Sequence, residues 1–105
     1  MKPARLTPAA KQDRRDEVLY SRTEAGASVA KKLVDAMKKA LHVLEQQPGI
    51  GSPAIGLELA IDGLRAWRLD GFPLSVWSFE RADHVLIVRV VGHQQDPEHL
   101  AVVDD

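Results

Sequence analysis

Arg89 is the residue whose sequence neighbours most strongly point to chemistry, because it interrupts the otherwise apolar run Val85–Val91. An arginine is almost never fully buried without partners. Its guanidinium presents five donors suited to phosphate or carboxylate groups. Two interpretations follow. Arg89 binds an anion on the open face of a sheet, or it forms a salt bridge with a carboxylate of its own chain or lies exposed. The residues leave both open.

Other cations and a histidine could join Arg89 in a site. Arg65 and Arg68 are three residues apart on a predicted strand, so they face opposite sides, and only one of them can accompany Arg89. His93 and Asp96 follow the last predicted strand as His-x-x-Asp. An imidazole near an arginine is suited to acid–base work. The alternative, which we favour, is a histidine that caps the strand end through backbone hydrogen bonds.

Metal and cofactor sites are not predicted. The chain has no cysteine, so thiolate-ligated zinc and iron–sulfur centres are excluded. His84, His93 and His99 lack helical or hairpin ligand spacing. The glycines at 49 and 51 lack the trailing Gly-Lys-Ser/Thr of a phosphate loop.

The two tryptophans, Trp67 and Trp77, both fall in predicted strands. They could stack on bases. Packing in a core or at a partner interface is the more common use of such residues.

The elements that must position these residues follow from local patterns. Thr7-Pro8 is a typical helix start, with Thr as N-cap and Pro at the first helical position. Apolar residues recur every three or four positions along the next helix, and its lysines are interpreted as a solvated face. Asp70-Gly71 is a strong hairpin signal. The predicted elements are a short strand or arm at 4–6, helices Pro8–Arg22 and Ala27–Gln46, a loop at 48–61, and strands Leu64–Leu69, Phe72–Phe79 and Val85–Val91.

This order, β-α-α-β-β-β, predicts an α+β domain in which a two-helix hairpin packs on a small antiparallel sheet. The 105 residues form one domain, with residues 97–105 as a flexible tail or helical turn. No apolar run approaches the roughly 20 residues of a membrane span, and no signal peptide is present, so we expect a cytoplasmic protein.

Charge is divided unevenly along the chain. Residues 1–47 carry a net charge of +4 and residues 48–105 a net charge of −5, for a total of −1. A general nucleic-acid binder usually has a strong basic excess. The balance therefore argues against sequence-independent RNA or DNA binding, although it leaves room for a small local site.

Several segments in order resemble the ParE/RelE superfamily of bacterial toxins. They are Thr7-Pro8-Ala9-Ala10-Lys11-Gln12-Asp13, then Tyr20, then Leu44-x-x-x-Pro48-x-x-Gly51, then Leu64-Arg65-x-Trp67 with Phe72-Pro73, and finally Arg89-Val90-Val91-Gly92-His93 with Asp96. The resemblance covers about residues 5–100. It implies that the chain is the toxin of a type II toxin–antitoxin module. The resemblance also implies a hetero-oligomer with a small antitoxin, in which the antitoxin's C-terminal segment wraps the toxin.

The two branches of that superfamily differ in chemistry. The resemblance to RelE-like members implies metal-independent cleavage of mRNA in the ribosome, with Arg65 and Arg89 on the phosphate and His93 as acid or base. The resemblance to ParE-like members implies inhibition of DNA gyrase by binding. This chain has no lysine after Lys39 and no tyrosine after Tyr20, and its sheet half is acidic, so we favour the ParE branch. A third hypothesis is an inactive relative that only binds the antitoxin as co-repressor.

For the ParE branch, the residues that we expect to contact a protein partner lie in the resembling segments. They are Tyr20, Leu64, Trp67, Trp77 and Arg89.

Overall fold

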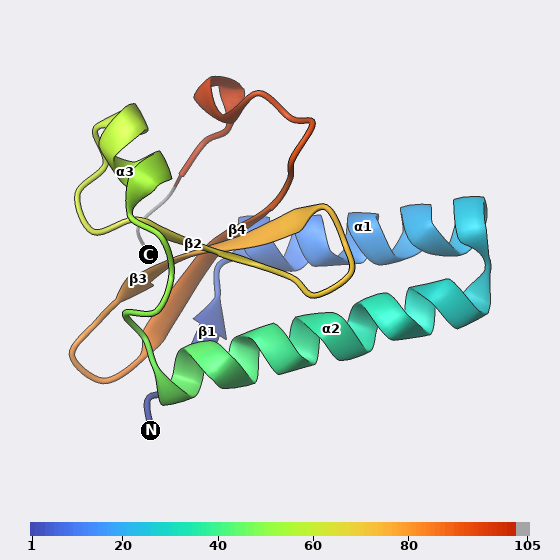
Figure 1. The fold of residues 1–105 in the computed structure, drawn as a ribbon, viewed down its shortest axis with the longest axis horizontal. Helices are drawn as coiled ribbons and strands as arrows, with labels where there is room; N and C mark the ends of the chain where they lie inside the picture. Colours follow the sequence, from blue (N-terminus) through green and yellow to red (C-terminus); the bar gives the residue numbers. More distant parts are fainter. Residues whose placement is uncertain (103–105) are drawn as a thin grey trace.

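A computed structural model describes residues 1–102 as one domain in which two long helices cover one face of a sheet and a short helix lies on the other face (Figure 1). In chain order the elements are β1 (Ala4–Leu6), α1 (Pro8–Ala25), α2 (Ala27–Gln46), α3 (Ala54–Leu59), β2 (Arg65–Arg68), β3 (Leu74–Glu80), β4 (Val85–Gly92) and the 3-10 turn η1 (Pro97–His99).

The sheet has the strand order β1-β4-β3-β2. β2, β3 and β4 are connected as antiparallel neighbours. β1 pairs with β4 in parallel, from Ala4 opposite Val85 to Leu6 opposite Ile87. The expected α+β order is therefore confirmed, while the sheet is mixed rather than wholly antiparallel. Parallel pairing requires a crossover from one end of the sheet to the other, and α1 and α2 begin that crossover.

Two apolar clusters fill the spaces on either side of the sheet. One lies between the sheet and the helices α1 and α2. The other lies on the opposite face, between the sheet and α3, which is at the top in Figure 1, and it also contacts Leu100 and Val102. The first includes Leu33, Met37, Leu44, Val76 and Ile87. The second consists of Leu64, Trp77, Phe79, Leu86, Val88 and Val91. Burial on both faces explains why β4 is almost continuously apolar.

The second layer of helix was not predicted. Residues 48–61 were expected to be a loop, but Ala54–Leu59 form α3, and its Ile55 and Leu59 pack against the second cluster. A buried glycine, Gly56, permits this close approach, because a Cβ there would lie 2.6 Å from the Leu64 carbonyl oxygen. The Gly, Pro and Ser residues at 49–53 favour a loop, so the short helix after them was not predicted from the sequence. Tertiary packing stabilises this helix more than intrinsic helix propensity does.

Of the two alternatives for the tail, a flexible segment or a helical turn, residues 97–99 form the 3-10 turn η1. Leu100 and Val102 pack against the second cluster. Residues 103–105 of the expected flexible tail lie outside the described residues.

The start of α1 is fixed to the edge of β4 by Thr7, which is 3% exposed. Its N–H donates to the Ile87 carbonyl at 2.9 Å, and its hydroxyl donates to the Val88 carbonyl at 3.1 Å. The same hydroxyl accepts the Ala10 N–H at 3.1 Å, which is the N-cap bond expected from the sequence. The Thr7 side chain therefore caps α1 and also donates a hydrogen bond to a backbone carbonyl at the edge of β4.

Thr7→Val should lower the free energy of unfolding by about 1–3 kcal/mol, because it removes a cap and leaves the buried Val88 carbonyl without its donor. Thr23→Val is the matched control, since that hydroxyl is exposed and bonds only to the Leu19 carbonyl. Its effect should stay within about 0.5 kcal/mol in urea denaturation. Equal losses for the two variants would contradict the anchoring role.

Candidate partner-binding site

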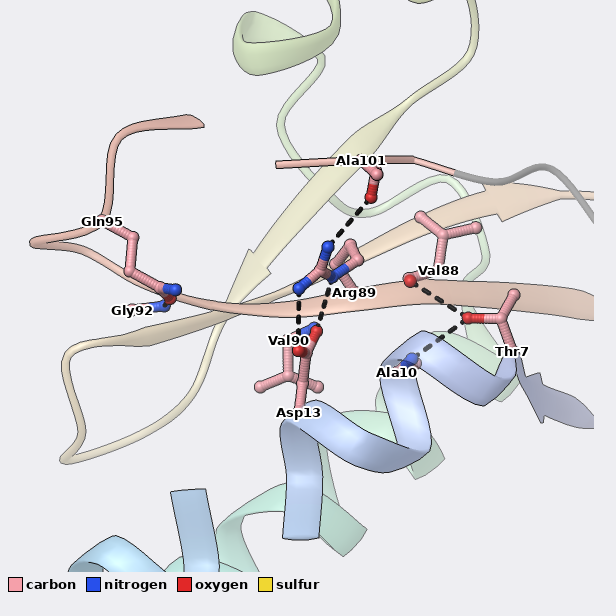
Figure 2. Close-up of polar contacts among 9 residues, drawn as sticks. All are labelled: Thr7, Ala10, Asp13, Val88, Arg89, Val90, Gly92, Gln95 and Ala101. Carbon is pink, nitrogen blue, oxygen red and sulfur yellow. Dashed lines mark hydrogen bonds and ion pairs between the residues drawn. The ribbon is translucent and has the colours of Figure 1, made fainter. Parts of the chain in front are cut away.

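Arg89 forms a salt bridge with Asp13 of α1, across 76 residues of sequence (Figure 2). Its Nε donates to Asp13 Oδ2 at 2.7 Å and its Nη2 donates to Oδ1 at 2.9 Å. Its Nη1 donates to the Ala101 carbonyl at 3.0 Å. Asp13 Oδ2 also accepts the Val90 N–H at 3.0 Å. Of the two interpretations left open, the salt bridge is the one that the structure contains.

The pair is largely withdrawn from water, with side-chain exposures of 17% for Arg89 and 14% for Asp13. The hydrogen bond to Asp13 raises the pKa of Arg89 above its ordinary value, while burial acts in the opposite direction. The guanidinium is therefore charged at every physiological pH and its bidentate partner fixes its plane. This arrangement holds α1, β4 and the tail together.

A β-bulge decides which way Arg89 points. Trp77 lies opposite Arg89 and Ser78 lies opposite Ile87, so Val88 is an extra residue in β4. Arg89 consequently shares the face of Trp77, which is the second cluster's face. Arg65 pairs with Ser78 and shares the α1–α2 face with Trp67, two residues further along β2. Its Nη1 donates to the Gly51 carbonyl at 2.8 Å. The two arginines thus lie on opposite faces of the sheet.

His93 follows β4 and is exposed. Its Nε2 shares a hydrogen bond of 2.8 Å with the hydroxyl of Ser75, and its N–H donates to the Pro73 carbonyl at 2.9 Å. The backbone bond fits the strand-end role that the sequence favoured. Among Arg65, Arg89 and His93, the described residues show no shared cluster that could grip one phosphate.

The expected partner-contact residues differ in how far they are exposed. Leu64 and Trp77 are buried, at 1% and 3% exposure, so they belong to the second cluster and not to a free surface. Trp67 packs in part against the first cluster. Tyr20 is 66% exposed on α1 and remains available for contact.

A hollow with a volume of about 530 Å³ lies between α1 and α2. Five apolar side chains line it: Val18, Leu19, Val34, Met37 and Leu41. Five cations surround them: Lys11, Arg14, Arg15, Arg22 and Lys38. Within residues 1–102 no carboxylate lines this hollow, which we call the hairpin groove. The lining of α1 spans Lys11 to Arg22, about 16 Å or three helical turns.

The hairpin groove was not predicted from the sequence, because the lysines of the second helix were interpreted as a solvated face. A signal was present in Val34 and Leu41, which lie beside the buried stripe of Leu33, Met37 and Leu44 and widen the apolar face. The first helix offers Val18 and Leu19 among cations at 11, 14, 15 and 22. Only the antiparallel pairing of the two helices turns these positions into one surface.

The sequence matches one known protein family. The family described as "ParE toxin of type II toxin-antitoxin system, parDE" matches residues 4–103. The chain therefore belongs to the ParE toxin family. No curated protein matches its sequence significantly.

A solved structure from the chromosomal ParDE TA system of P. aeruginosa has a similar fold. The TM-score is 0.74 at 21% identity, over 88% of this chain and 96% of that one. The likeness confirms the expected RelE/ParE-like fold.

Within residues 1–102 no group of three or more His, Asp or Glu side chains could hold a metal ion. No helix in that range is long and apolar enough to cross a membrane.

Asp13→Asn should lower the free energy of unfolding by about 2–4 kcal/mol, because it leaves the Arg89 charge without its counter-charge in a mostly buried place. Asp16→Asn is the control, since that carboxylate is exposed and, among residues 1–102, accepts a hydrogen bond from the exposed Gln12 side chain at 2.7 Å. We expect its effect in urea denaturation to be within about 0.5 kcal/mol. A loss of similar size for Asp16→Asn would count against the assignment.

Glu17 gives a pH dependence of known sign. Burial, followed by the charges of Asp13 and Asp16, raises its pKa. A folded pKa above the unfolded one means that this group favours folding at low pH and loses that contribution as pH rises through the folded value. Glu17→Gln should therefore stabilise the protein at pH 7, and the gain should fade near pH 4. Urea denaturation of both proteins at several pH values measures this, and an equal effect of Glu17→Gln at pH 4 and pH 7 would contradict it.

Proposed function

We propose that this protein is the toxin of a type II toxin–antitoxin module, that it arrests growth by inhibiting DNA gyrase, and that a cognate antitoxin neutralises it. The ParE family match supports the first part. The second is supported by the state of Arg89, whose guanidinium is engaged by Asp13 and Ala101 and lies on the other face of the sheet from Arg65. We place this proposed activity in the bacterial cytoplasm.

The observation that carries the proposal is the hairpin groove, which is suited to a protein segment. Its apolar floor favours aliphatic or aromatic side chains, and its cations favour acidic neighbours. An amphipathic helix with a stripe at i, i+3 or i+4 and i+7 and flanking Asp or Glu has this chemistry. We assign the groove to the antitoxin's C-terminal segment, which would order as it binds.

The target is tested by macromolecular labelling after induced expression without antitoxin. We expect incorporation into DNA to stop before incorporation into protein. Arg65→Ala and His93→Ala should still arrest growth, provided that circular dichroism confirms their fold. Earlier loss of protein synthesis, abolished by these substitutions, would establish a ribosome-dependent nuclease instead. No arrest by the unmodified chain would establish an inactive, antitoxin-binding relative.

Charge reversal in the hairpin groove tests the antitoxin site. Arg15→Glu should weaken antitoxin binding at least tenfold, because it places a carboxylate against the acidic segment. The matched control is Lys32→Glu, which makes the same charge change on an exposed residue of α2 outside the groove. Titration calorimetry between 50 and 300 mM salt should show the antitoxin affinity falling with salt for the unmodified toxin and less steeply for Arg15→Glu. Equal weakening by the two reversals would place the antitoxin elsewhere.

A further inference from the structure

The C-terminal residues cover the face of the sheet opposite the hairpin groove. Leu100 and Val102 are half-buried against the second cluster, while Ala101 between them is exposed. This alternation is that of an extended segment lying on an apolar surface. We call Leu100–Val102 the strap.

Within residues 1–102, the strap makes one long-range hydrogen bond, from Arg89 Nη1 to the Ala101 carbonyl, visible above Arg89 in Figure 2. The Leu100 N–H also donates to the Pro97 carbonyl of η1 at 3.2 Å. The two inward side chains of the strap add apolar contacts to the second cluster. The donor itself is fixed, because Asp13 holds the other two guanidinium nitrogens of Arg89. The donor is therefore held by more hydrogen bonds than the strap residue that it binds.

Part of the surface beside the strap is already open. A depression of about 270 Å³ lies between Ile55 of α3 and Pro97 of η1. Ala66, Trp77 and Val91 form its apolar lining. It continues the apolar face that Leu100 and Val102 cover, so displacing the strap would join the two into one larger apolar surface.

We propose that this face is a second docking surface, which the free chain closes with its own strap. Its occupant is an extended partner segment with two aliphatic side chains two residues apart. The carbonyl between those side chains accepts the hydrogen bond from Arg89. The strap makes the same contacts within the chain, through Leu100, Val102 and the Ala101 carbonyl. The inference does not depend on the toxin's target, nor on which partner fills the hairpin groove on the other face.

The test uses Trp77 as reporter in a Trp67→Phe background, because Trp77 lies in the covered cluster and is 3% exposed. Leu100→Asp should release the strap and raise the acrylamide quenching constant of Trp77 at least twofold. Ala101→Asp adds the same charge to the outward-facing position of the strap and should leave quenching unchanged. Equal quenching of the parent and Leu100→Asp, or an equal rise in both variants, would overturn the proposal.

A peptide corresponding to residues 97–105 serves as the partner probe. Added to the Leu100→Asp protein, it should restore the low quenching constant, whereas the same peptide carrying L100S and V102S should not. Failure of the unmodified peptide to protect Trp77 would overturn the docking claim.

Hydrogen exchange on the unmodified chain removes any dependence on variant folding. Amides 100–102 should exchange at least tenfold faster than those of β3 and β4 if the strap opens by itself. Exchange at the same rate as the central strands would show that the strap belongs to the global core, and would contradict the proposal.

Discussion

The contact of the Asp13 carboxylate with Arg89 and the Val90 N–H determines how the two layers of this protein fit together. β1 covers the edge of β4 only as far as Ile87, because it is three residues long. Beyond it the edge would present unpaired backbone groups. Thr7 and Asp13, on the first turns of α1, supply the missing partners. The position of α1, and with it the hairpin groove, follows from this edge.

The same salt bridge reaches the other face of the sheet. The bulge at Val88 turns Arg89 toward the second cluster, where its third guanidinium nitrogen binds the strap. Arg89, which the sequence offers as a candidate phosphate ligand, therefore links α1, β4 and the tail through hydrogen bonds. Removing it for a nuclease test would disturb the fold, which is why Arg65 and His93 are the more informative substitutions.

The sequence predicted most of the fold because its local signals agree with the tertiary structure. The second helix was predicted as Ala27–Gln46 and has those bounds, since its apolar period and the Pro48-Gly49 stop coincide with the packing. Thr7-Pro8 likewise marked the start of α1. The parallel pairing of β1 and the short helix α3 depend on contacts distant in sequence, so no local pattern specifies them.

The candidate site was harder to predict than the fold. The partner of Arg89 lies 76 residues away, and the bulge that orients its side chain has no marker in a run of valines. Strand alternation correctly separated Arg65 from Arg68, but it could not assign Arg65 and Arg89 to opposite faces without the register. The hairpin groove needed two helices to be paired before its ten lining residues could be seen as one surface.

The two halves of the chain carry opposite charge, and this division corresponds to the two layers. The basic half contains both helices of the hairpin groove, and the acidic half contains β2, β3, β4 and the strap. A partner with an acidic amphipathic segment is attracted to the first layer, while the strap-covered face offers mainly apolar contacts. The two proposed docking surfaces lie on opposite faces of the sheet, so the proposed partners do not compete for one surface.

The most direct test of binding without catalysis compares two purified systems. The toxin is added to DNA gyrase in a supercoiling assay and, at the same concentrations, to translating ribosomes with primer-extension mapping of the mRNA. The account predicts dose-dependent loss of supercoiling, reversed by the antitoxin, and intact mRNA. Site-specific mRNA cleavage with unimpaired supercoiling would contradict it.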